Sequence, residues 1–226
     1  MWDGKNKALT FSYDDGISQD KRLVEIFNKY GMKCTFNLNS GIMSENGSFI
    51  IKDVPVRRLT ADECKEIYTG HEIAVHTLTH PSLTELEDNE IRIEIMQDKE
   101  SLEIIFGTEI FGMAYPYGTF NDKVIRIAEE CGIKYSRTVF DAPDFAPQKN
   151  LMVYRATCHH KNDKLWELLD SFLSYKGNDP AIFCLWGHSY EFDVDDNWER
   201  IEEFCRRASG HDDIFYGTNS EVLLSK

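Results

Sequence analysis

Short apolar runs alternate with longer amphipathic segments along almost the whole of this 226-residue chain. The apolar runs read as strands, and the segments between them have the spacing and end signals of helices. The candidate strands are Leu9–Tyr13, Cys34–Leu38, Glu72–Val75, Gly112–Tyr115, Lys134–Thr138, Met152–Arg155, Ile182–Trp186 and Ile214–Tyr216. The candidate helices are Lys21–Tyr30, Asp62–Tyr68, Asp88–Phe106, Asp122–Cys131, Asp163–Tyr175 and Trp198–Ala208. Such alternation predicts an α/β fold on a largely parallel sheet.

Several predicted helices carry end signals. Thr60 and Glu63 have the spacing of a capping box. Gly31, Gly107 and Gly132 stand where helices commonly end in a left-handed residue. These signals support the helix boundaries independently of the apolar pattern.

Composition indicates a folded chain with one core. Hydrophobic residues make up 42% of it, and it has no linker, repeat or low-complexity segment, so we expect a single α/β barrel domain over residues 1–226. The six cysteines are scattered without a C-x-x-C pair, so we expect free thiols rather than disulfides or a cysteine zinc site.

Charge and hydropathy exclude some partners. A net charge of −14 argues against nucleic acid, which needs a basic surface, and disfavours strongly anionic glycans unless the site is locally basic. No apolar stretch approaches the length of a membrane span, so we expect no membrane partner. The start of the chain has no hydrophobic signal region, which predicts a cytoplasmic location and leaves secretion open for a trimmed chain.

Two carboxylates follow the first predicted strand. Asp14 and Asp15 stand at its C-terminal end, where open α/β sheets and barrels place their chemistry. Neighbouring residues of a strand point to opposite faces, but Gly16 permits a tight turn. We therefore expect both carboxylates to face one cavity.

Two histidines follow another strand. His76 comes directly after Glu72–Val75, and His80 stands four residues later. Because His80 precedes Pro81, we expect it to be extended and the pair to line a loop rather than a helix face. One carboxylate and two imidazoles leave a metal position open for water, which is typical of a hydrolytic metal site. The alternative is a set of solvated acids and ordinary loop histidines.

Two more predicted strands end in motifs. In these motifs, together with the two described above, the chain resembles the NodB-type polysaccharide deacetylases of carbohydrate esterase family 4. The similar segments are Ser12-Tyr13-Asp14-Asp15-Gly16 for T-F-D-D-G, His76-Thr77-Leu78-Thr79-His80-Pro81 for H-[ST]-x-x-H, Tyr115-Pro116-Tyr117-Gly118 after its strand, and Leu185-Trp186-Gly187-His188 for L-x-H. The resemblance runs from about Lys7 to Glu221. It implies a distorted (β/α) barrel of about seven strands.

The resemblance also implies roles for these residues. Asp15, His76 and His80 would hold a divalent metal; zinc suits this ligand set, although cobalt, nickel or manganese could replace it. Asp14 would be the general base and His188 the general acid, while the backbone N–H of Tyr117 would bind the oxyanion. The implied function is removal of N- or O-acetyl groups from a carbohydrate by attack of metal-bound water. The oligomeric state stays open.

Two departures from the family pattern matter. Ala114 stands where the R-x-P-[YF] motif has an arginine that orients the base, and the D-x-x-D-W motif has no clear counterpart near Tyr135–Thr138. Arg137 ends a predicted strand and could bring a cation to the same face; the plainer interpretation is a surface arginine. These departures leave open hydrolysis of cyclic imides or other non-peptide C–N bonds. An inactive carbohydrate-binding barrel is the alternative of another class.

Other residues near the motifs receive weaker predictions. His159 and His160 could reach the active face, but paired loop histidines are usually solvated. His71 lies at the far end of its strand, where we expect a structural role. The aromatic residues near the late motifs could line a sugar subsite or belong to the core. They are Tyr115, Trp186, Tyr190, Phe192 and Trp198.

Overall fold

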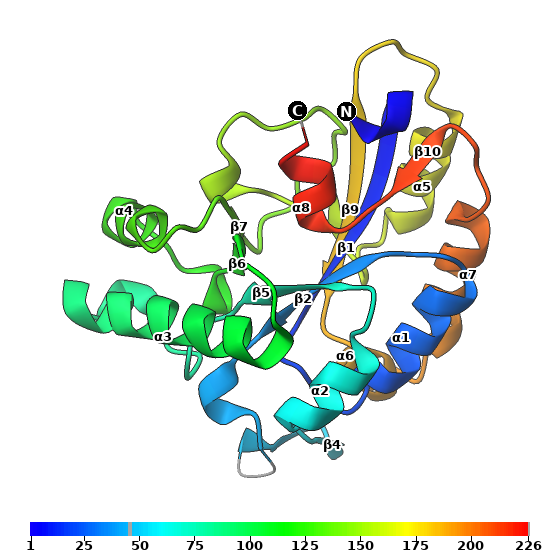
Figure 1. The fold of residues 1–226 in the computed structure, drawn as a ribbon. Helices are drawn as coiled ribbons and strands as arrows, with labels where there is room; N and C mark the ends of the chain where they lie inside the picture. The colour runs from blue at the N-terminus through cyan, green and yellow to red at the C-terminus, as the bar shows by residue number, and fades with distance from the viewer. Residues whose placement is uncertain (45–46, 226) are drawn as a thin grey trace.

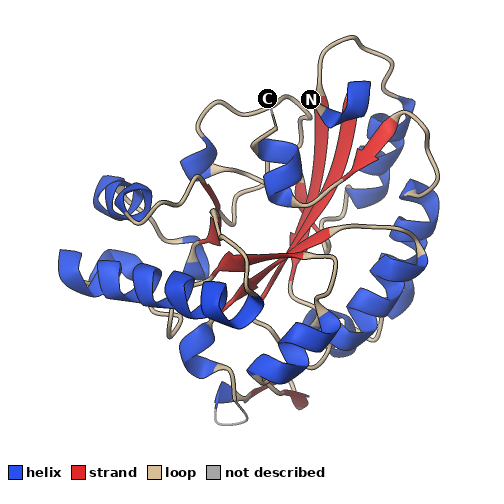
Figure 2. Ribbon diagram, viewed as in Figure 1, coloured by secondary structure: helices blue, strands red, loops and turns tan. Residues whose placement is uncertain are grey.

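The computed structural model describes residues 1–44 and 47–225. The strands of its main sheet run through the middle of the molecule and most of its helices lie outside them (Figures 1 and 2). One parallel sheet has the order β7-β6-β5-β2-β1-β9-β8, and β10 pairs with the first residues of β1. Its strands are β1 (Lys7–Asp14), β2 (Cys34–Leu38), β5 (Glu72–Val75), β6 (Gly112–Ala114), β7 (Tyr135–Arg137), β8 (Cys158–His159), β9 (Ala181–Gly187) and β10 (Ile214–Tyr216).

The α-helices lie between these strands in the chain, except for the last helix, which follows β10. They are α1 (Asp20–Lys29), α2 (Ala61–Ile67), α3 (Asp88–Phe106), α4 (Asp122–Glu130), α5 (Leu165–Ser174), α6 (Tyr190–Val194), α7 (Trp198–Ala208) and α8 (Asn219–Leu223). All six predicted helices are present, with ends within two residues of the prediction. The Thr60–Glu63 capping box is formed, and Gly107 caps α3 in the left-handed conformation.

The sheet curls into an incomplete barrel, which confirms the predicted fold class. The series of paired strands begins at β7 and ends at β8, which leaves the barrel open between these two strands. On the β7 side of the opening, one isolated parallel bridge pairs Arg137 with Tyr154. The predicted strand Met152–Arg155 is wrong. A 3-10 helix occupies Leu151–Val153 because the Asn150 side chain accepts a hydrogen bond from the Met152 N–H and turns the chain. The regular strand of this unit is β8, further along the chain.

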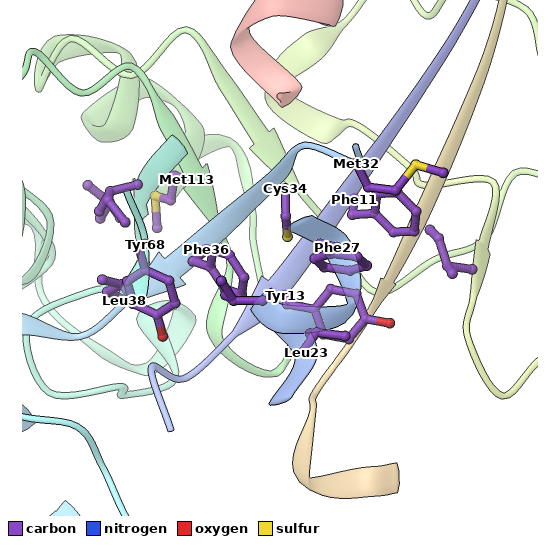
Figure 3. Packing of buried hydrophobic residues seen from close by; sticks show 14 of the residues in the cluster. Phe11, Tyr13, Leu23, Phe27, Met32, Cys34, Phe36, Leu38, Tyr68 and Met113 are labelled. Atoms are coloured by element: carbon purple, nitrogen blue, oxygen red, sulfur yellow. The ribbon is translucent and has the colours of Figure 1, made fainter. Parts of the chain in front are cut away.

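Every residue of β1 and β2 is buried, because the sheet is covered by helices outside and by side chains within the barrel. Phe11 of β1 packs on Phe27 of α1, with ring centroids 4.5 Å apart. Phe36 of β2 stacks on Tyr68 at 4.3 Å (Figure 3). This core fixes the direction of β1, and therefore the position of the residues that follow it.

One antiparallel hairpin, β3 (Phe49–Ile51) and β4 (Val54–Val56), was not predicted from the sequence. Its turn residues Lys52 and Asp53 both have positive φ, 45° and 68°, as in the two-residue turns that suit twisted hairpins. The hairpin matters for function because it carries Phe49 to the candidate site.

Two further properties concern the described part of the chain. All six cysteines are buried free thiols. Among the helices in residues 1–44 and 47–225, none combines the length and the apolar character needed to cross a bilayer.

Candidate active site

The predicted site residues meet in one cavity of about 420 Å³ at the C-terminal ends of the strands. β1, β5 and β9 each deliver a polar residue there, as expected for parallel strands whose carboxyl ends share one edge. The cavity is lined by Asp14, Asp15, Phe49, Arg58, His76, His80, Tyr115, Tyr117, Val139, Trp186, His188 and Tyr190. All six residues assigned a role from the sequence are therefore brought together.

The turn after β1 places both carboxylates in the cavity, as predicted. Gly16 has φ 63°, which favours glycine, and an added Cβ there would lie 2.9 Å from a terminal methyl carbon of Leu38, which would have to move. Asp15 itself has φ 88°, an uncommon conformation for a residue with a side chain. The strained turn rotates Asp15 away from the face that strand alternation would give it.

The loop after β5 is also strained, and here one expectation is wrong. His80 has φ 64° rather than the extended conformation expected before a proline, and Thr77 has φ 68°. The His80 N–H donates to Thr77 Oγ1 at 3.1 Å, and Asn39 donates to the Thr77 carbonyl oxygen at 2.9 Å. These bonds fold the loop so tightly that the local preference set by Pro81 is overridden.

Asp15, His76 and His80 form a group that could hold a metal, with one ligand atom from each within 4.8 Å of the others. His76 is suited to this role because its Nδ1 lies 2.8 Å from the Ala114 carbonyl oxygen. A proton on Nδ1 makes that hydrogen bond and leaves the Nε2 lone pair for a metal, which is the usual arrangement of histidine ligands. Burial lowers the pKa of His76 to about 4, so the neutral ligand form dominates near pH 7.

Arg58, which the sequence did not single out, holds the carboxylate of Asp15. Its Nη2 lies 3.1 Å from Asp15 Oδ1, and its Nη1 donates to Asn39 Oδ1 at 2.8 Å. Burial raises the pKa of Asp15, but His188, Arg58 and the two neighbouring histidines lower it more, so the carboxyl stays ionised. The three candidate ligands thus present two nitrogen atoms and one anionic oxygen, a donor set that fits a divalent zinc-like metal.

Asp14 is held by a different set of partners. Asn37 Nδ2 donates to its Oδ1 at 2.8 Å, and the Arg137 guanidinium donates to its Oδ2. Burial raises the pKa of Asp14, yet Arg137 and the nearby histidines bring it down to about 2. Asp14 is therefore an ionised acceptor at neutral pH.

Arg137 is buried in the barrel, so the interpretation as a surface residue is wrong. Its side chain is only 1% exposed, and its Nε and Nη1 donate to Ser12 Oγ and the Thr138 carbonyl oxygen, each at 3.1 Å. In the sheet register Arg137 of β7 stands beside Ala114 of β6. The guanidinium missing at Ala114 is thus supplied from the neighbouring strand.

His188 follows β9 and lies beside Asp14 in the cavity, with Nε2 3.8 Å from Asp14 Oδ2. Its Nδ1 lies 3.3 Å from Oε2 of Glu191, one turn along the chain. Burial lowers the pKa of His188, but the hydrogen bond to Glu191 and the charges of Asp14 and Asp15 raise it to about 9. His188 is therefore protonated at neutral pH.

Glu191 was not predicted as a site residue from the sequence. Its position three residues after His188 could have indicated a contact between the two side chains. His159 Nε2 lies 3.0 Å and His160 Nε2 3.3 Å from its Oε2, so the prediction of two solvated histidines is wrong. His159, His188 and Glu191 could also group around a metal. However, the Lys161 N–H donates to His159 Nδ1 at 3.2 Å, which leaves the proton of neutral His159 on Nε2 and favours a hydrogen bond to Glu191 over a metal bond.

The remaining predictions divide between site and core. Tyr117 has φ 56° and is 66% exposed as a residue, and its ring centroid lies 4.6 Å from that of His80 at the mouth of the cavity. Tyr115, Trp186 and Tyr190 line the cavity, whereas Phe192 and Trp198 belong to the core. His71 lies outside the cavity lining and accepts a hydrogen bond from the Cys34 N–H at 3.2 Å, in agreement with a structural role.

Comparison with known proteins identifies the family. The family model for polysaccharide deacetylase matches residues 3–136, which is more than half of the chain. The chain belongs to the polysaccharide deacetylase family. The peptidoglycan-N-acetylglucosamine deacetylase PgdA of Listeria monocytogenes is 25% identical over 143 residues, which cover 62% of this chain and 27% of the relative. The chain spans less than half the length of the curated relatives that it matches.

Solved structures of this family share the fold. A Mycobacterium smegmatis protein assigned to the polysaccharide deacetylases superimposes with a TM-score of 0.69 at 17% identity, covering 98% of this chain and 90% of that one. A family 4 pseudoenzyme from Bacillus anthracis superimposes with a TM-score of 0.57 at 18% identity, covering 97% of this chain and 66% of that one.

Proposed function

We propose that this deacetylase-family chain is an active, metal-dependent hydrolase that removes N- or O-acetyl groups from a carbohydrate. One observation carries the proposal: a buried carboxylate, Asp14, and an imidazole, His188, lie 3.8 Å apart in the cavity that is also lined by the candidate metal ligands. Hydrolysis of an acetamide needs a base for the attacking water and an acid for the departing amine. A binding module needs neither.

The candidate metal ligands are Asp15, His76 and His80. A divalent metal there would polarise the acyl carbonyl and lower the pKa of a water ligand. We expect the purified protein to bind about one equivalent of zinc, with cobalt, nickel or manganese able to replace it. Elemental analysis after dialysis tests this, with His76→Ala as the depleted variant and His71→Ala as the matched control away from the cavity. A wild-type protein that stays metal-free after incubation with zinc contradicts the proposal.

The protein's own groups perform the proton transfers. Asp14 accepts a proton from the attacking water, and Arg137 keeps this carboxylate ionised and oriented. His188 then gives the proton on Nε2 to the leaving nitrogen or oxygen, while Glu191 holds the opposite nitrogen of the ring. The backbone N–H of Tyr117, at the cavity mouth, would donate to the oxygen that becomes negative as the acyl carbon turns tetrahedral.

The aromatic wall supports a sugar as substrate. Phe49, Tyr115, Tyr117, Trp186 and Tyr190 line the cavity. Sugar rings pack against aromatic faces, with their hydroxyl groups left to polar partners. Hydrolysis of cyclic imides or other small amides is the alternative. The missing arginine at Ala114 left it open, and Arg137 donates a hydrogen bond to Asp14 in that arginine's place.

Release of acetate or amine decides between these functions. The metal-loaded protein is assayed on acetylated chito-oligosaccharides, peptidoglycan fragments, acetylated xylan and simple cyclic imides, with Asp14→Asn as the blank. We expect acetate from at least one acetylated carbohydrate and no opening of imides. Imide hydrolysis alone selects the alternative, and binding of oligosaccharides without release of any product indicates an inactive barrel.

A further inference from the structure

Asp20 joins three segments around the active site through a single buried carboxylate. It is the first residue of α1 and is fully buried. Its Oδ2 accepts hydrogen bonds from the Ile17 N–H at 3.1 Å and from the Tyr68 hydroxyl at 2.6 Å. Its Oδ1 accepts one from the Ser189 hydroxyl at 2.5 Å. Ile17 follows the Asp14-Asp15-Gly16 turn, and Ser189 follows His188, so one side chain connects the segment of the base with that of the acid.

The bond to Ser189 is unusual for its position. Ser189 precedes α6 at the N-cap, where a serine side chain would ordinarily accept from a backbone N–H of the first turn. It makes no such bond, and instead its hydroxyl donates to Asp20. The hydroxyl is completely buried, so its hydrogen bond would be costly to lose. The start of α6 is thus attached to α1 rather than capped by its own serine.

The attached segment carries three groups of the site. His188 stands immediately before Ser189, Tyr190 immediately after it, and Glu191 is the partner of the His188 ring. A displacement of Ser189 would therefore move the acid, its carboxylate partner and one wall of the cavity together. The separation of 3.8 Å between His188 Nε2 and Asp14 Oδ2 depends on where this segment is held.

We propose that Asp20 is a positioning residue which, through Ser189, sets the placement of the His188–Glu191 pair relative to Asp14. This inference rests on the proposed function, because it assigns Asp20 a part in the same reaction. Asp20 touches neither the cavity nor the candidate metal ligands. Burial raises its pKa to about 6 against the effect of its three donors, so above that pH it accepts all three bonds as a carboxylate.

A matched pair of variants separates positioning from simple stabilisation. Ser189→Ala removes the bond to α6, and Tyr68→Phe removes a bond of similar length to the same carboxylate but leaves α6 attached. Both lose one buried hydroxyl group, so we expect both to lower the unfolding midpoint by similar amounts while keeping the metal content. Asp20→Asn tests the carboxylate itself, since the amide nitrogen is a donor and one hydroxyl partner would have to turn round and accept instead of donating.

Kinetics on an acetamide and on an activated aryl acetate give the decisive readout. For Ser189→Ala we expect kcat on the acetamide to fall by about tenfold or more, and kcat on the ester to fall much less. We also expect the alkaline limb of its pH profile to move to lower pH, because Glu191 then holds His188 less firmly. Tyr68→Phe should stay within about twofold of wild type on both substrates, with an unchanged pH profile. Equal losses in the two variants, or an unchanged acetamide rate in Ser189→Ala, overturn the inference.

Titration of the His188 ring, followed by NMR in the zinc-loaded protein, separates this inference from the proposed function. If wild type hydrolyses none of the acetylated substrates, the proposed function fails, and the ring pKa still tests the coupling. A lower ring pKa in Ser189→Ala but not in Tyr68→Phe supports the attachment through Asp20. The same ring pKa in wild type and both variants refutes it.

Discussion

Replacement of Arg137 by methionine should damage the site more than any surface substitution. The methionine keeps an unbranched stem of moderate length and removes the charge that faces Asp14. Both side chains of this ion pair are almost completely buried, at 1% and 4% exposure. Removing one partner therefore leaves an ionised carboxyl in a medium of low polarity, without its counter-charge.

The size of the effect follows from the pKa of Asp14. Burial raises this pKa, but Arg137 and the histidines bring it from 3.8 down to about 2. The folded state thus favours ionised Asp14 by about 2 kcal/mol. Because the folded pKa is the lower one, this stability is present above pH 4 and is lost as the pH falls toward 2. Without Arg137 the cost of burial is no longer offset, and loss of one partner of a buried pair typically costs about 3–5 kcal/mol.

Denaturant unfolding of the metal-stripped protein at pH 7 measures this loss, and adding Asp14→Asn to Arg137→Met should recover part of it. In the metal-loaded enzyme the acid limb of kcat/KM should move up by roughly two pH units, because Asp14 then titrates near or above its ordinary range. Arg126→Met, which breaks exposed ion pairs with Asp88 and Glu130, is the control and should change little. A loss of under about 1 kcal/mol in Arg137→Met, with an unmoved acid limb, would refute the reasoning.

The other predictions concern the acid, the base and the metal ligand. Asp14→Asn should keep the metal and lose about 10² to 10⁴ in kcat, whereas Asp15→Asn should lose metal affinity. Elemental analysis and rate measurements on both variants test this, and the reverse pattern would mean that the two roles are exchanged. His188→Ala should lose far more rate on an acetamide than on an activated aryl acetate, with unchanged metal content, and equal losses would make it a positioning group. Glu191→Gln should lower the pKa of His188 from about 9 and move the alkaline limb to lower pH; an alkaline limb that stays in place would show that Glu191 does not hold the acid protonated.

The sequence alone determined the layout of the barrel and the groups that carry its chemistry. The runs Cys34–Leu38 and Glu72–Val75 became strands with the predicted ends. Most of their residues are apolar, as a strand buried on both faces requires, and their polar side chains bond inside the fold, for example Thr35 with Glu72 and Asn37 with Asp14. Parallel pairing then places the residue after each strand at one edge, so the joint position of Asp14, His76 and His188 follows from chain order. These features depend on residues close together in the sequence.

Tertiary structure decided what surrounds those groups. Arg137 stands 123 residues from Asp14, and its partner is set by the register of β7 beside β6, which no local pattern encodes. The Ser189–Asp20 bond likewise spans 169 residues. At His80 the folded loop overrides a local preference. The bond from the His80 N–H to Thr77 Oγ1 accompanies a positive φ, although a residue before proline ordinarily favours an extended conformation. The local sequence pattern therefore determines which side chains lie at the edge of the sheet. Long-range packing determines which charged groups and hydrogen-bond partners surround them, and hence their protonation states.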